Sequence, residues 1–139
     1  MSGTRLKVLL GEDNPAILQE TRNLLADEFD LAGAAENGAS LVAAAQRINP
    51  DIVVADIRMP ELDGIEACRR ILELRCCRAA VILSVSNSPE LVNAAFDAGI
   101  SAYVLKDDAG EELIRAIYAA VQGKGFVSSG IHSHPAILY

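Results

Sequence analysis

The sequence predicts an α/β fold in which helices cover both faces of a doubly wound parallel sheet. Five short apolar runs alternate along the chain with five amphipathic helical patterns. The apolar runs are nearly continuous, and continuous runs are typical of parallel strands that are buried on both faces. The connections between runs and helices are short, which favours right-handed β-α-β crossovers within one sheet.

The five predicted strands consist mainly of Val, Ile, Leu and Ala. They cover residues 6–10, 31–35, 52–55, 80–83 and 102–105.

Capping residues mark the starts of the first two predicted helices. Asn14 is a good N-cap, and Pro15 after it suits the first helical position. The second helix follows Asn37-Gly38 and ends before Pro50. Apolar stripes at helical spacing contain Ile17, Leu18, Leu24 and Leu25 in the first helix, with Thr21 between them, and Leu41, Ala45 and Ile48 in the second.

The other three predicted helices have similar boundaries. The third follows Asp63-Gly64, the fourth opens at Ser88-Pro89 and closes at Gly99, and the fifth ends near Gly123. The buried faces are expected to contain Ile65, Cys68, Ile71 and Leu72 in the third helix and Leu113, Ile114, Ile117 and Val121 in the fifth. Gly, Ser, His and Pro dominate the residues after Gly123, so we expect regular structure to fade there.

Composition limits the class of protein. A chain of 139 residues suits one domain, and 51% apolar residues exclude global disorder. The net charge of -7 would repel nucleic-acid phosphates, which argues against DNA or RNA binding by this segment alone. No apolar run approaches the ~18 residues of a membrane span. The N-terminus lacks a signal-peptide core, so a cytoplasmic protein with three reduced cysteines is expected.

Chemically active side chains collect where the predicted strands end. Glu12 and Asp13 follow the first strand, Asp56 the third, Ser84 the fourth and Lys106 the fifth. Ligands of open α/β sheets bind beyond the carboxyl ends of the strands. The sequence therefore predicts a site with three carboxylates, a hydroxyl and an ammonium group at one edge of the sheet.

Three crowded carboxylates indicate a bound cation, because like charges held close are costly unless they are neutralised. Oxygen ligands without thiolates suit Mg²⁺. A magnesium ion opposite a lysine would hold a phosphoryl group, since both cations can neutralise its oxygens during transfer. Asp56, in the middle, could then be the nucleophile that becomes phosphorylated.

The motifs at the strand ends resemble those of a response-regulator receiver domain of two-component systems. The resemblance extends from about residue 6 to residue 123. Its motifs are Glu12-Asp13, Asp56-Ile57-Arg58-Met59-Pro60, Asp63-Gly64, Leu83-Ser84 and Tyr103-Val104-Leu105-Lys106. Residues 84–87, 98–103 and 123–125 further resemble the NarL/FixJ-type subfamily.

This resemblance implies a flavodoxin-like doubly wound (βα)5 fold with a parallel sheet of order 2-1-3-4-5. Strands one and three are neighbours in that order, so Asp13 and Asp56 would lie side by side. Residues 5–123 would form the receiver domain. Residues 124–139 would form a tail, or the start of a linker to an output domain outside these 139 residues.

The resemblance also assigns roles around the metal. Asp56 accepts phosphate from a sensor histidine kinase. Asp13 and Asp56 ligate Mg²⁺ (or Mn²⁺) together with the backbone carbonyl of Arg58, and Glu12 helps through bound water.

Three further residues receive roles in the switch. Ser84 senses the phosphoryl group, Lys106 pairs with it, and Tyr103 rotates as the signal spreads. One departure from the family's pattern is Asp107, where many receivers have proline. A cis peptide costs ~0.5–1 kcal/mol before proline and ~2.5–4 kcal/mol elsewhere, so the isomer of the Lys106–Asp107 bond stays open.

The function that follows is a phospho-acceptor signalling switch, expected to be the receiver part of a DNA-binding transcriptional regulator. It would accept phosphate on its own aspartate, with autodephosphorylation, and would not turn over an external substrate. Its partners would be the kinase, a second copy on phosphorylation, and DNA only through a downstream helix-turn-helix domain, with no membrane. The alternative is a stand-alone receiver or a phosphorylation-independent scaffold that acts by protein–protein contacts.

Two enzyme or ligand classes fit less well. A phosphatase of the haloacid-dehalogenase kind needs a second acid two residues after its nucleophile, and Arg58 occupies that position. A flavin phosphate needs a cradle of amides after the first strand, where Glu12 and Asp13 would repel it.

Overall fold

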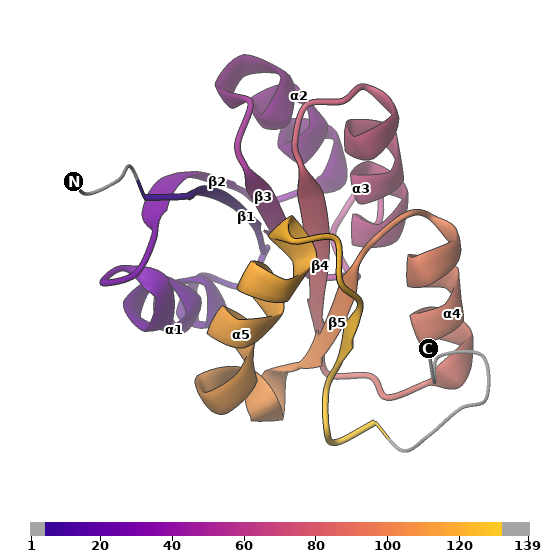
Figure 1. The fold of residues 1–139 in the computed structure, drawn as a ribbon. Helices are drawn as coiled ribbons and strands as arrows, with labels where there is room; N and C mark the ends of the chain where they lie inside the picture. Colours follow the sequence, from indigo (N-terminus) through magenta and orange to yellow (C-terminus); the bar gives the residue numbers. More distant parts are fainter. Residues whose placement is uncertain (1–4, 132–139) are drawn as a thin grey trace.

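The computed structural model describes residues 5–131, and in this part of the chain six parallel strands form one sheet (Figure 1). Five strands match the predicted apolar runs to within one residue at each end. They are β1 (Lys7–Gly11), β2 (Asp30–Ala35), β3 (Ile52–Ala55), β4 (Ala79–Ser84) and β5 (Ala102–Leu105). Their order, β2-β1-β3-β4-β5, confirms the doubly wound topology.

Five α-helices connect these strands. They are α1 (Pro15–Leu25), α2 (Gly38–Ile48), α3 (Gly64–Glu73), α4 (Pro89–Asp97) and α5 (Ala109–Val121). A 3-10 turn, η1 (Lys106–Asp108), precedes α5. Side chains cap four of the helices: Asn14, Asn37, Asp63 and Ser88 accept hydrogen bonds from backbone N–H groups in the first turns of α1 to α4. The caps at Asn14 and Ser88 were predicted from the sequence.

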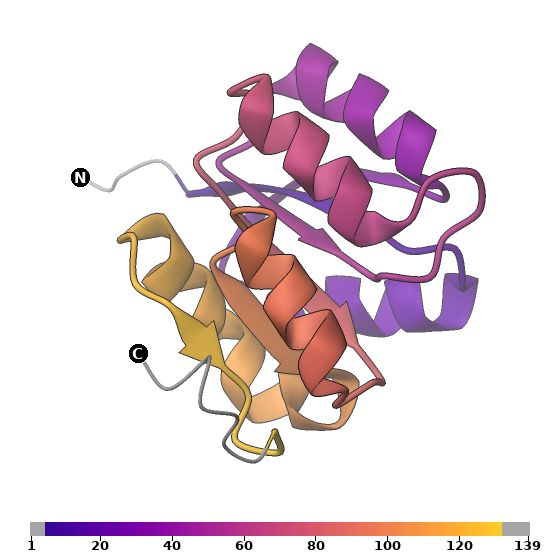
Figure 2. The same cartoon turned by 90° about the vertical axis from the view of Figure 1, so that its right-hand side faces the viewer.

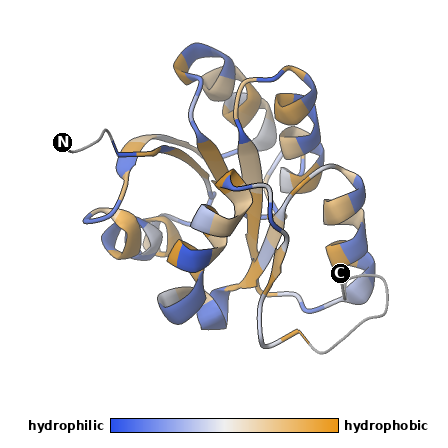
Figure 3. Ribbon diagram, viewed as in Figure 1, coloured by the Kyte–Doolittle hydropathy of each residue, from blue (hydrophilic) through white to orange (hydrophobic). Residues whose placement is uncertain are grey.

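The helices form two layers, with α1 and α5 on one face of the sheet and α2, α3 and α4 on the other (Figures 1 and 2). The buried side chains divide into two clusters accordingly, one on each face. The central strands are the most apolar part of the molecule (Figure 3). Cys68 is fully buried on α3, and its burial raises the pKa of its thiol, which fits a packing role.

One face of α1 differs in detail from the predicted stripe. Leu25 is fully buried, whereas Ile17 is only partly buried. Thr21, which lies within the predicted stripe, is buried, and its Oγ1 donates a hydrogen bond to the Ile17 carbonyl at 2.9 Å.

Regular structure does not end at Gly123, and that expectation is wrong for residues 126–127, whereas residues 129–131 form a turn and a bend. A short strand, β6 (Phe126–Val127), pairs in parallel with β5, and both Ser128 and Ile131 are buried. The physical reason is that β5 would otherwise be an open sheet edge with unpaired backbone groups. The division into a domain at 5–123 and a tail remains a prediction, and residues 132–139 lie outside the described part.

No helix in residues 5–131 combines the length and the apolar character that crossing a membrane requires.

Candidate functional site

The sheet order brings the predicted acidic residues together at the carboxyl edge. β1 pairs with β3 so that Gly11 is in register with Ala55, and the Asp56 N–H donates to the Gly11 carbonyl at 2.9 Å. The residues that follow each strand therefore become neighbours. Carboxylate oxygens of Glu12, Asp13 and Asp56 all lie within 4.8 Å of one another. Oxygen atoms at this spacing can hold a hard divalent cation.

Lys106 contributes the positive charge of the site. It is the first residue of η1, directly after β5. Its Nζ lies 3.1 Å from Glu12 Oε1 and 3.4 Å from Asp56 Oδ2. All three side chains are largely shielded from solvent, so this pairing is stronger than that of an exposed ion pair.

Glu12 is the most buried acid of the site, with 6% of the residue exposed. Its desolvation raises the pKa of the carboxyl above the ordinary value of 4.5, and the nearby charge of Asp56 acts in the same direction. The Asn14 N–H, which donates to Oε2, and Lys106 oppose this shift without cancelling it. A nearby cation would stabilise the charged form of Glu12.

A raised pKa makes the ionisation of Glu12 unfavourable to folding. The folded-state pKa of Glu12 is higher than its unfolded-state pKa. The contribution of Glu12 to the free energy of unfolding is therefore highest below pH 4.5 and falls as pH rises through the folded-state pKa. We therefore compare the free energies of unfolding of the metal-free wild type and of Glu12→Gln. The wild-type value minus the Glu12→Gln value is expected to fall as pH rises from 4.5 through the folded-state pKa and then to level off. Urea unfolding of both proteins in chelator, from about pH 4 to pH 8, measures this difference. A difference independent of pH would contradict it.

Gly64 shapes the loop that carries Asp56, a role that the sequence motifs did not reveal. Its N–H donates to the Ile57 carbonyl at 2.8 Å, which closes the loop between β3 and α3. A Cβ atom at this position would lie only 1.8 Å from the Asp56 carbonyl oxygen. The Asp63-Gly64 pair at the helix start was the available signal, since glycine permits close backbone approach.

Arg58 lies in the same loop, between two buried side chains. Ile57 and Met59 are both 8% exposed and belong to the core cluster, whereas Arg58 is exposed. The two anchors hold the loop backbone against the domain. The arginine side chain extends to solvent, and only its backbone carbonyl was predicted to act in the site.

Ser84, the last residue of β4, and Tyr103, within β5, both form hydrogen bonds with Ser86. Ser84 is buried, and its Oγ accepts a hydrogen bond from the Ser86 N–H at 3.0 Å. Tyr103 is fully buried, and its hydroxyl donates to the Ser86 carbonyl at 2.7 Å. Burial raises the pKa of Tyr103, so its hydroxyl is protonated and able to donate. The rotation predicted for Tyr103 would therefore begin or end at this buried position.

The Lys106–Asp107 peptide is trans, as are the other peptide bonds in residues 5–131.

Val85, which follows Ser84, is 71% exposed and borders the site. With its neighbours it lines a groove beside Lys106, and the groove's apolar lining comprises Ile17, Leu24, Leu83, Val85 and Ala109.

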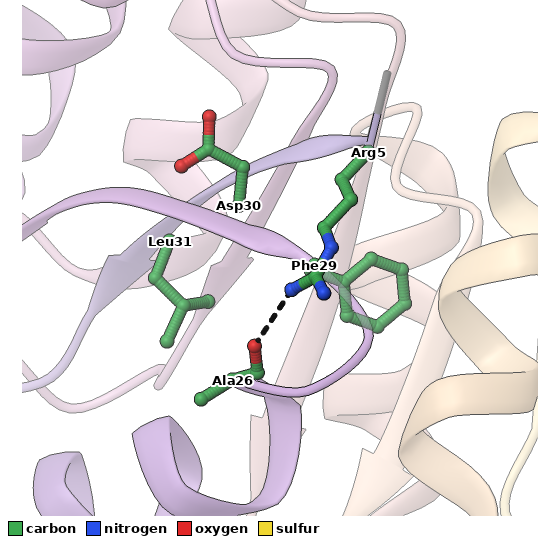
Figure 4. A pocket seen from close by; sticks show the side chains of 5 residues that line it. All are labelled: Arg5, Ala26, Phe29, Asp30 and Leu31. Carbon is green, nitrogen blue, oxygen red and sulfur yellow. Dashed lines mark hydrogen bonds between the residues drawn. The ribbon is translucent and has the colours of Figure 1, made fainter. Parts of the chain in front are cut away.

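A second hollow lies at the opposite, amino edge of the sheet and contains none of the predicted site residues. Figure 4 shows its lining of Arg5, Ala26, Phe29, Asp30 and Leu31. The Arg5 guanidinium donates one hydrogen bond, from Nη1 to the Ala26 carbonyl at 3.1 Å (Figure 4).

The fold and the site together define a class: doubly wound α/β domains with an acidic cluster and a lysine at the carboxyl edge of the sheet. The family model of the response regulator receiver domain matches residues 8–118. The chain belongs to the response regulator receiver domain family.

The curated relatives are bacterial regulators of this type. The chain is 33% identical to the transcriptional regulatory protein YxjL of Bacillus subtilis (strain 168), over 89% of this chain and 58% of the relative. It is 30% identical to the nitrate/nitrite response regulator protein NarL of Escherichia coli (strain K12), with the same coverage. The chain thus spans little more than half the length of these relatives.

Solved structures agree with the fold. A two-component response regulator of the LuxR family from Aurantimonas sp. SI85-9A1 superposes with a TM-score of 0.86 at 27% identity, covering 92% of this chain and 93% of that one. The isolated receiver domain of RcsB from Salmonella enterica serovar Typhimurium, at 24% identity and a TM-score of 0.81, supports the fold alone, covering 92% and 96%. The matches confirm the family and the NarL-type resemblance indicated by the motifs.

Proposed function

We propose that this domain is a phospho-acceptor switch, phosphorylated on Asp56 by a sensor histidine kinase. The observation that carries the proposal is the position of Lys106 Nζ, which lies 3.4 Å from Asp56 Oδ2 and pairs with Glu12 in a site of three clustered carboxylates. This arrangement offers a carboxylate nucleophile, a cation beside it and oxygen ligands for a second cation. A phosphoryl group needs those three parts for transfer.

The donor set fits Mg²⁺ or Mn²⁺. Asp13 and Asp56 would hold the ion directly, the Arg58 carbonyl would complete the protein ligands, and Glu12 would act through water. When bound, the ion supplies neutralisation of the phosphoryl oxygens. The exposed position of Asp13 leaves the site open to solvent and to a phosphodonor.

The residues of this chain perform the remaining steps. An oxygen of Asp56 attacks the phosphorus of a phosphohistidine, and the new O–P bond forms as the P–N bond breaks and its electron pair stays on the histidine nitrogen. Lys106 compensates the charge of the transferring group. Ser84 lies at the end of β4, where its hydroxyl can leave the Ser86 N–H and donate to a phosphoryl oxygen.

A phosphoryl group on Asp56 can shift a conformational equilibrium only if it binds one state better than the other. The contacts of Ser84 and Tyr103 with Ser86 offer such a difference, because the Ser86 N–H donates to the Ser84 hydroxyl while the Ser86 carbonyl accepts from the Tyr103 hydroxyl. We infer that these contacts rearrange with phosphorylation and alter the surface around α4 and β5. Homodimer formation is the expected consequence.

The proposal places the chain in the cytoplasm, as the receiver part of a transcriptional regulator that binds DNA only through a downstream helix-turn-helix domain. The relatives named transcriptional regulators support this, and the net charge of -7 argues against DNA binding by the receiver alone. Turnover of an external substrate is not part of the proposal, and autodephosphorylation would return the switch to rest.

Substitution of the proposed nucleophile tests the function. With Mg²⁺ and acetyl phosphate, the wild type is expected to gain one base-labile phosphoryl group and Asp56→Asn none, because an amide cannot form the acyl phosphate. Intact-protein mass spectrometry measures the gain of mass. Asp51→Asn, at the other end of β3, is the matched control and should be labelled like the wild type. Equal labelling of Asp56→Asn would place the phosphate elsewhere, and an unlabelled wild type would favour the scaffold alternative.

A further inference from the structure

The segment that follows α5 is tied to the edge of the sheet by main-chain hydrogen bonds. We call residues 126–131 the C-terminal strap. The Phe126 N–H donates to the Ser101 carbonyl at 3.1 Å, and the Ser128 N–H donates to the Tyr103 carbonyl at 2.9 Å. Ser128 is 1% exposed and Ile131 is 7% exposed, so the strap is packed against the domain rather than lying on its surface. Figure 2 shows the strand of the strap at the sheet edge.

Two carboxylates hold the strap, and we call Asp108 and Glu112 the clasp. Ser128 Oγ lies 2.5 Å from Asp108 Oδ2 and 2.8 Å from Glu112 Oε1. The Ser129 N–H and hydroxyl both donate to Glu112, and the Gly130 N–H donates to Asp108 Oδ2 at 3.0 Å. Burial acts to raise the pKa of Glu112, but the hydrogen bonds from Ser129 and Ser128 outweigh it, and the pKa is lowered. Glu112 is thus an ionised acceptor.

Sequence patterns did not reveal the clasp, because its two acids lie on η1 and α5, the strap residues that they hold lie beyond β6, and no periodicity links them. The two acids accept hydrogen bonds from three consecutive strap residues, Ser128 to Gly130. A Cβ atom at residue 130 would lie 2.7 Å from Asp108 Oδ2, so glycine is what lets the strap approach this carboxylate.

The strap lies against Tyr103. Val127 is in register with Tyr103 across the parallel pair, so the two side chains point to the same face of the sheet. Ile131 and Tyr103 belong to one core cluster, and Val127 packs against it. The clasp also adjoins the acidic site along the chain, since η1 begins with Lys106 and ends with Asp108.

We propose that the C-terminal strap is a conformational device that holds Tyr103 in its buried position, and that Asp108 and Glu112 are the positioning residues that keep the strap closed. A closed strap fills the space beside β5 and covers its open edge. An open strap would uncover Tyr103 and the free backbone groups of β5. The consequence for signalling rests on the proposed function, in which Tyr103 belongs to the switch.

Two pairs of variants test the device in the resting protein, without a phosphodonor. The first pair compares Asp108→Ala/Glu112→Ala with Asp107→Ala/Glu111→Ala, which removes the same charge from exposed neighbours. The second compares Gly130→Ala, whose Cβ displaces the Asp108 carboxylate, with Gly125→Ala, whose Cβ would meet nothing closer than 3.9 Å. The glycine pair leaves both acids in place, so it remains informative if the double variant does not fold.

Two measurements report on the strap and on Tyr103 separately. Amide hydrogen exchange of Phe126 and Ser128 is expected to be at least about tenfold faster in the clasp and Gly130 variants than in their controls, because their main-chain bonds to β5 open more often. Fluorine NMR of protein containing 3-fluorotyrosine should show a larger solvent isotope shift for Tyr103 in the same variants, with signals assigned by Tyr118→Phe and Tyr139→Phe. If the strap only stabilised the domain and did not hold Tyr103, the solvent isotope shift of the Tyr103 signal would be the same in variants and controls.

Each outcome decides a part of the proposal. Equal exchange in variants and controls overturns the clasp. Faster exchange with an unchanged Tyr103 signal overturns the holding role. Labelling of Asp56 with acetyl phosphate is measured in parallel, and its failure in the wild type would overturn the proposed function while leaving the strap result intact.

Discussion

Gly64→Ala is expected to lower the free energy of unfolding by about 3 kcal/mol or more, because the added Cβ cannot fit in the observed backbone. That atom would lie 1.8 Å from the Asp56 carbonyl oxygen and 2.8 Å from its carbonyl carbon. Both are main-chain atoms, so no flexible side chain can move aside. The loop between β3 and α3 must open, and the Gly64 N–H must leave the Ile57 carbonyl.

Urea unfolding followed by circular dichroism measures this loss of stability. Gly110→Ala is the matched control, since a Cβ at residue 110 in α5 meets nothing within 4 Å. Alanine favours a helix over glycine, so stability of the control should stay the same or rise by up to about 1 kcal/mol. The same displacement moves Asp56, and we expect slower labelling by acetyl phosphate in Gly64→Ala below its unfolding transition. Stability equal to that of the wild type would show that the loop has another low-energy path.

Asp13→Asn is expected to weaken Mg²⁺ binding by at least about tenfold, because it would remove one of the charged ligands of the proposed hard-cation site. Isothermal titration with Mg²⁺ alone measures the affinity without any phosphodonor. The other two acids of the site remain, with Glu12 paired to Lys106. In chelator, the free energy of unfolding of Asp13→Asn should be no lower than that of the wild type, because one repulsive charge has been removed from the cluster.

Asp27→Asn makes the same change of charge in the exposed connection between α1 and β2, at the amino edge of the sheet. Its Mg²⁺ affinity should equal that of the wild type. An equal loss in both variants would indicate an effect of net charge, and unchanged affinity in Asp13→Asn would remove Asp13 from the metal site.

Local sequence patterns were sufficient to predict the five longer strands, the five helices and their order along the chain. Strand positions follow from nearly continuous apolar runs, and helix positions follow from the period of 3.6 residues and from caps such as Asn14 and Ser88. All of these signals act over a few residues. The placement of Glu12, Asp13, Asp56, Ser84 and Lys106 at one sheet edge followed from their position directly after parallel strands. The sheet order required the family resemblance, because periodicity does not state which strands pair.

Local patterns therefore predicted the fold class, the five longer strands, the five helices and the set of residues at the carboxyl edge, but not β6. The folded chain alone shows that Lys106 pairs with Glu12 as well as Asp56, that Tyr103 is buried against Ser86, that Gly64 touches the Asp56 carbonyl and that Asp108 and Glu112 hold the strap. These features depend on distances between segments far apart in the chain. Such distances are set by strand register, loop closure and side-chain packing together, and no short stretch of sequence contains them.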